Sequence, residues 1–65
     1  MCTIILNGKT QKTEHNNVED LILGLELPNL FVVEHNGDVV YKENYKTKKL
    51  EDGDIIEIAS FCGGG

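Results

Sequence analysis

Two Asn-Gly dipeptides constrain the fold of this chain more than any other feature of its sequence. Asn7-Gly8 and Asn36-Gly37 each separate two short runs that are typical of strands. Asn-Gly is the strongest short-range hairpin signal, because both central residues of a type I′ turn need a positive φ. The flanking runs are residues 3–6 and 9–13 around the first turn, and residues 30–35 and 38–41 around the second. The sequence therefore predicts two β-hairpins, with polar residues 9–13 suited to an edge strand.

One amphipathic helix is predicted between the hairpins. Four apolar side chains recur at the i, i+3, i+4 and i+7 positions of a helix: Val18, Leu21, Ile22 and Leu25. Asn16 or Asn17 is placed to cap its N-terminus. Pro28 disfavours helical geometry in the residue before it, so we expect the helix to end by about Glu26.

The remaining segments complete a ββαββ pattern with one further strand. Residues 42–50 are polar and irregular, residues 51–54 form a turn, and residues 55–61 form the last strand. Such an order buries one helix stripe against one sheet face. We therefore predict an α+β, ubiquitin-like β-grasp fold, with a mixed five-stranded sheet whose first and last strands lie parallel at its centre. The predicted core is Ile4, Leu6, Val18, Leu21, Ile22, Leu25, Phe31, Val33, Val40, Leu50, Ile56 and Ile58. The opposite face of the last strand is predicted to carry Ile55, Glu57, Ala59 and Phe61.

The chain is expected to form one domain, residues 1–61, followed by a flexible glycine tail, residues 62–65. At 65 residues there is room for one small core and not for a roomy internal active site. Glycine has no Cβ, so a run of glycines can thread a narrow tunnel and leaves the last carboxylate unguarded. A disordered end without function is the alternative.

The net charge of −5 makes nucleic acid and anionic membrane surfaces poor partners and favours a partner with a basic surface. The alternative is that the acidity serves solubility only. The N-terminal residues lack the features of a signal peptide, which predicts a cytoplasmic protein. No Cys/His spacing of a metal site is present, so no metal is expected.

The two cysteines and two histidines carry no predicted catalytic role. Cys62 is interpreted as an incidental thiol; the alternative is an intramolecular thioester or a mixed disulfide with an activating partner. Cys2 begins the first strand and Cys62 follows the last, so parallel pairing separates them by about 15 Å. A disulfide needs Cα atoms within about 7 Å and is therefore not expected. His15 and His35 have no nucleophile at a recognisable spacing and are interpreted as surface polar residues.

The motifs together resemble the thiamine-biosynthesis sulfur carrier proteins, and the resemblance covers nearly the whole chain. The segments that carry it are residues 17–22, 36–40, 42–45, 51–54 and 56–58, together with the end Phe61-Cys62-Gly63-Gly64-Gly65. Tyr45 stands where family members usually have tryptophan. Tyr41 replaces a common proline and Cys62 a typical aliphatic residue. These departures leave the partner subtype open and do not touch the glycines.

The resemblance implies a protein cosubstrate with no catalytic residue of its own. The Gly65 carboxylate would be adenylated and then converted to a thiocarboxylate. Gly64 would give a slender approach to it, and Gly63 further reach. The implied docking surface is Phe61, Cys62, Ala59 and Glu57. Phe61 packing at the sheet edge is the alternative for that residue.

The resemblance also implies the partners. An E1-like adenylyltransferase would use ATP and magnesium, a cysteine desulfurase or persulfide carrier would supply the sulfur, and thiazole synthase would receive it. No cofactor is expected on the chain itself. Three alternatives remain open: a molybdopterin-synthase small subunit or other metabolic sulfur carrier, a ubiquitin-like modifier of lysines, and an interaction domain whose glycines are a linker remnant.

Overall fold

The computed structural model describes residues 1–60 and contains the predicted strands and helix in the predicted order. Beyond the prediction, a short 3-10 helix, η1, lies within the segment expected to be irregular. The elements are β1 (Cys2–Leu6), β2 (Lys9–Thr13), α1 (Val18–Leu23), β3 (Phe31–His35), β4 (Asp38–Val40), η1 (Lys42–Asn44) and β5 (Ile55–Ser60).

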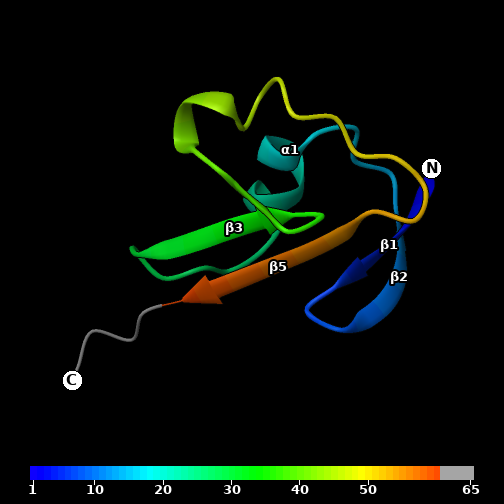
Figure 1. Cartoon of the computed structure of the whole chain (residues 1–65), viewed down its shortest axis with the longest axis horizontal. Helices are drawn as coiled ribbons and strands as arrows, with labels where there is room; N and C mark the ends of the chain where they lie inside the picture. Colours follow the sequence, from blue (N-terminus) through cyan, green and yellow to red (C-terminus); the bar gives the residue numbers. More distant parts are fainter. Residues whose placement is uncertain (61–65) are drawn as a thin grey trace.

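The strands form one mixed sheet of order β2-β1-β5-β3-β4, so the first and last strands meet at the sheet centre as predicted. β5 runs parallel to β1, with Ile5 opposite Ile55, and antiparallel to β3. Strand β2 lies at the edge beside β1, in agreement with its polar sequence. Figure 1 shows β5 crossing the molecule between β1 and β3, with α1 packed across the sheet. The predicted β-grasp architecture is confirmed.

Helix α1 is shorter than predicted, since it ends at Leu23 and not near Glu26. Its start is as expected, because the Asn17 side chain accepts a hydrogen bond from the Asp20 N–H over 2.8 Å. At the other end the Gly24 N–H bonds back to Leu21 and Ile22, and the chain then leaves the helix. Glycine is a poor helix former, so it ends the helix before the proline does.

The core lies between α1 and the inner face of the sheet. Eight apolar residues are buried there: Ile4, Leu6, Val18, Leu21, Val33, Val40, Leu50 and Ile56. The other four predicted core residues, Ile22, Leu25, Phe31 and Ile58, are only partly buried and pack against this cluster. The early end of α1 explains Leu25, because a residue outside the helix no longer follows the buried stripe.

Candidate functional site: the end of the central strand

Strand β5 carries the described part of the predicted site and leads directly into residues 61–65. It is held on both sides at its start, where β1 and β3 both pair with it. Toward its end only β3 continues, and the last pair is Phe31 with Ser60. Within residues 1–60, the edge of β5 past Ile58 therefore has no strand beside it. The backbone of that edge is available to hydrogen-bond a partner chain.

Asn7 and Asn36 fix the start of β5 from opposite sides. Each lies at positive φ, 49° and 52°, in its hairpin turn. The Asn7 N–H donates to the Ile56 carbonyl and the Asn7 Oδ1 accepts from the Ile58 N–H. Asn36 makes the same two bonds with the N–H and carbonyl of one residue, Ile55. Each side chain thus replaces a backbone acceptor after its own strand has turned away.

A charged cluster at the start of β5 provides further bonds between the second hairpin turn and this strand. Asp54 Oδ2 lies 2.7 Å from His35 Nε2 and accepts from the Glu51 N–H over 2.8 Å. The Asn36 amide donates to Asp54 Oδ1 over 3.1 Å. The sequence led us to expect His35 to be a surface polar residue, and this prediction was wrong. Its side chain is only 12% exposed and is paired with Asp54.

The net effect of this cluster is to lower the pKa of Asp54. Burial acts in the opposite direction, because removal of water disfavours the carboxylate. The hydrogen bonds from the Glu51 backbone, His35 and Asn36, with the charge of His35, outweigh that burial. Asp54 is consequently held as a carboxylate that ties the turn before β5 to the second hairpin.

Glu57 and Ala59, two of the predicted docking residues, are exposed on the sheet face opposite α1. They alternate along β5 with the inward-facing Ile56 and Ile58. Glu57 is directly opposite Glu34 of β3, and Ala59 is opposite Val32. The prediction of these outward positions is confirmed, but no observation on residues 1–60 tests their contact with a partner.

The other predicted site residues lie outside the described part of the chain. These are Phe61, Cys62, Gly63, Gly64 and Gly65. Cys2 is half-buried and has no disulfide partner within residues 1–60. The expectation about a disulfide to Cys62 therefore remains a prediction, as do the role of the tail and its flexibility.

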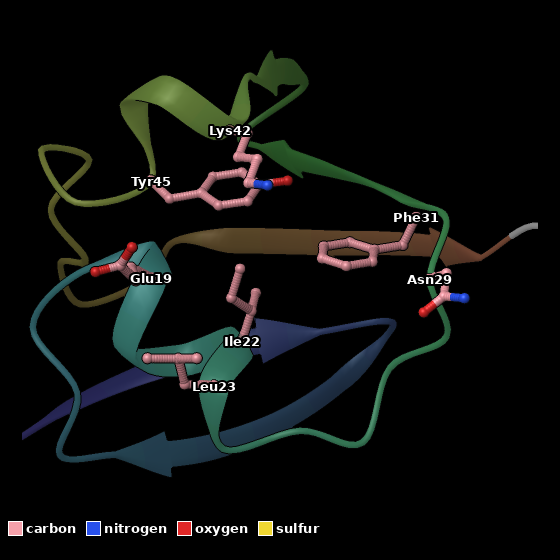
Figure 2. A pocket seen from close by; sticks show the side chains of 7 residues that line it. All are labelled: Glu19, Ile22, Leu23, Asn29, Phe31, Lys42 and Tyr45. Carbon is pink, nitrogen blue, oxygen red and sulfur yellow. The ribbon is translucent and has the colours of Figure 1, made fainter.

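A surface groove of about 350 Å³ lies on the helix side of the sheet. Its lining residues are Glu19, Ile22, Leu23, Asn29, Phe31, Lys42 and Tyr45 (Figure 2). The Phe31 and Tyr45 rings are nearly parallel, 14° apart, with centroids separated by 6.4 Å. The lining combines apolar area with one negative side chain, Glu19, and one positive side chain, Lys42.

The described residues contain no feature that points to a bound metal or a membrane span. Within residues 1–60 no three His, Cys, Asp or Glu side chains are grouped so that they could hold a metal ion. No helix of this part is long and apolar enough to cross a membrane.

Sequence reasoning missed three features of this region. The Asp54–His35 pair joins residues 19 positions apart, which no local motif reveals. The Glu34–Glu57 pair depends on strand register, which the hairpin pattern alone does not give for β3 and β5. The groove was also missed, although the aromatic residue at position 45 had been noted as a family feature.

These observations define a ubiquitin-like β-grasp protein whose central strand, β5, leads into residues 61–65. Comparison with known proteins narrows this class. The model of the ThiS family matches residues 4–65, which includes the glycine run. The chain belongs to the ThiS family.

Individual relatives agree with this assignment. The sulfur carrier protein ThiS of Bacillus subtilis strain 168 is 40% identical over 63 residues, covering 92% of this chain and 96% of the relative. The crystal structure of the thiamine biosynthesis protein ThiS from Geobacter metallireducens is 31% identical and superposes with a TM-score of 0.79, covering 97% of this chain and 99% of that one. The solution structure of a thiamine biosynthesis protein from the same organism superposes with a TM-score of 0.77, covering 97% of this chain and 87% of that one.

Proposed function

We propose that this chain is a sulfur carrier of thiamine biosynthesis and that it carries sulfur as a thiocarboxylate on Gly65. The observation that carries the proposal is the family match, which extends through the glycine run to residue 65. The relative that is 40% identical is named as a sulfur carrier, which supports it. The fold supports it, because residues 61–65 follow directly from a strand anchored on both sides of its start.

A carboxylate must be activated before sulfur can attack it, since resonance and negative charge protect its carbon. In the proposed sequence the Gly65 carboxylate attacks the α-phosphate of ATP on an E1-like adenylyltransferase that uses magnesium. Pyrophosphate leaves and an acyl-adenylate forms. The outer sulfur of a persulfide then attacks the carbonyl carbon and displaces AMP, which gives an acyl disulfide. A second thiol takes the inner sulfur as a disulfide and releases the Gly65 thiocarboxylate.

The chain itself acts as a substrate in these steps and not as a catalyst. Gly64 and Gly63 give the tail a slender approach to the partner's active site, because they add no side chains. Phe61, Cys62, Ala59 and Glu57 form the proposed docking surface. The exposure of Ala59 and Glu57 on the outer face is consistent with that role.

The proposed partners are the adenylyltransferase, a cysteine desulfurase or persulfide carrier as the sulfur source, and thiazole synthase as the acceptor. Neither nucleic acid nor a membrane is proposed as a partner, given the net charge of −5. The persulfide chemistry needs thiols kept reduced, so we place the protein in the cytoplasm.

Intact-mass analysis tests the proposed chemistry. The chain is incubated with the cognate adenylyltransferase, ATP, magnesium and a persulfide source, and we expect a mass gain equal to the replacement of one oxygen by sulfur. A variant lacking Gly65 is the control and should show no gain. An unchanged mass of the full chain would contradict the proposal. High-mass conjugates to lysines of other proteins would instead identify a modifier.

A further inference from the structure

Two glutamates face each other on the outer side of the sheet. Glu34 of β3 and Glu57 of β5 are direct cross-strand partners, and their side chains project to the face opposite α1. Like charges directly opposite in a sheet destabilise it. The fold therefore keeps an unfavourable pair between β3 and the central strand β5.

No cation of the described chain relieves this repulsion. Among residues 1–60 the one ion pair is His35–Asp54, which lies on the opposite side of β3. Lys12, the lysine on the outer side of β2, faces Thr3 and is separated from β5 by strand β1. Both carboxylates are thus left without a partner in residues 1–60.

Apolar residues surround the pair. Val32 and Ala59 form the next outward cross-strand pair, and Val39 of β4 is opposite Glu34. Val39 is 46% exposed and Ile55 44% exposed. We call this patch the outer acidic face and define it as Val32, Glu34, Val39, Ile55, Glu57 and Ala59. The patch combines apolar area with two negative charges at its centre. An arginine matches both features, because its alkyl stem is apolar and its guanidinium is positively charged.

We propose that the outer acidic face binds an arginine presented by the adenylyltransferase, with the guanidinium between Glu34 and Glu57. Its five N–H donors satisfy two carboxylates at once. The stem packs on the neighbouring outward pair, Val32 and Ala59, and binding converts the cross-strand repulsion into two charge-assisted bonds. This inference rests on the proposed function, because it assigns the partner surface that receives β5 while the tail is activated.

The proposal predicts opposite effects on stability and on binding. Glu34→Gln together with Glu57→Gln removes the repulsion, so the thermal midpoint should stay equal or rise. The same change should weaken binding to the adenylyltransferase at least about tenfold at low salt, as for close interfacial charge pairs. It should also flatten the dependence of affinity on salt.

The matched control is Glu14→Gln together with Glu26→Gln, which changes the net charge equally at two exposed positions outside the outer acidic face. We expect its affinity to stay within about twofold of the wild type. A second variant, Glu34→Lys, pairs with Glu57 inside the chain; it should raise the thermal midpoint further and abolish measurable binding. Equal affinity of the paired Gln variants and the wild type would overturn the inference, as would a wild type that does not bind the enzyme.

Thiocarboxylate formation separates this inference from the proposed function. The variant with both Glu34→Gln and Glu57→Gln should still be converted fully when the adenylyltransferase is saturating. The KM of the enzyme for this variant should be raised, and the maximal rate should be unchanged. Conversion of all variants at one KM would refute the arginine site and leave the function standing. Binding without conversion of the wild type would refute the function and leave the site standing.

Discussion

The two hairpins are built on the same Asn-Gly dipeptide, yet the structure ties them to the central strand differently. In both, an asparagine at positive φ bonds to β5 through its backbone N–H and its side-chain oxygen. Only the second asparagine also donates to Asp54, which is held by His35 and the Glu51 backbone. The turn of the first hairpin is thus fixed to β5 by neutral hydrogen bonds, and the turn of the second is fixed by a charged cluster as well. The Asn-Gly motif determines the local geometry of each turn. Residues far away in the sequence, such as Asp54, determine how the stability of the second turn responds to pH.

The largest effect is expected where both hairpins depend on one residue. Ile56 is fully buried and is opposite Leu6 of β1 and His35 of β3. Ile56→Ala should cost about 3 kcal/mol, through lost burial and the cavity left behind. Hydrogen exchange should show the amides of both hairpins losing protection together. Loss in one hairpin alone would show that the central strand does not couple them.

Substitution of the two asparagines should distinguish the hairpins. Glycine accepts positive φ, so Asn7→Gly and Asn36→Gly remove the side-chain bonds and leave the turn unstrained. We expect Asn7→Gly to lower the free energy of unfolding by about 1 kcal/mol and Asn36→Gly by about 2 kcal/mol, since the latter also loses the charge-assisted bond to Asp54. Urea unfolding at neutral pH measures both. Equal losses would contradict the additional role of Asn36.

A smaller effect is expected for the carboxylate itself. Asp54→Asn preserves the size of the side chain and removes its charge, so the bonds from His35 and the Glu51 N–H weaken. We expect a loss of about 1 kcal/mol at neutral pH, discounted because the cluster is near the surface. Thermal unfolding should place this variant a few degrees below the wild type. A midpoint above the wild type would show that burial of the carboxylate outweighs its bonds.

The same group predicts a difference in acid stability. The folded-state pKa of Asp54 is below its ordinary value of 3.8, so its stabilisation is fully present above that pH. It is lost as the pH falls through the lower folded value, when the carboxylate is protonated. Amides around Asn36 should therefore lose exchange protection in acid before those around Asn7, and Asp54→Asn should remove the difference. Simultaneous loss in the wild type would refute the charged cluster as its cause.

The sequence was informative wherever a local motif determines the structure. The Asn-Gly dipeptides predicted both hairpins, and the capping position of Asn17 predicted the start of α1. The parallel pairing of the first and last strands followed from the element order. The end of α1 was predicted wrongly, because Gly24 ended the helix before Pro28 did.

Contacts between residues far apart in the sequence could not be predicted from the local sequence patterns. His35 was interpreted as a surface residue, since its partner Asp54 lies in another element. Glu57 was predicted to face outward, but its opposition to Glu34 needed the register of β3 on β5. The glycine positions of the site came from the resemblance and the tail, and they lie outside the residues described. Side-chain pairing between elements depends on packing that periodicity does not encode.

Transfer of labelled sulfur tests the central claim most directly. The chain is prepared with a heavy sulfur isotope in the Gly65 thiocarboxylate, purified, and incubated with thiazole synthase and its other substrates in the absence of any further sulfur source. We predict that the isotope appears in the thiazole product and that the intact mass of the chain returns to that of the carboxylate. A chain that keeps its label, or a product that forms without it, would contradict the account.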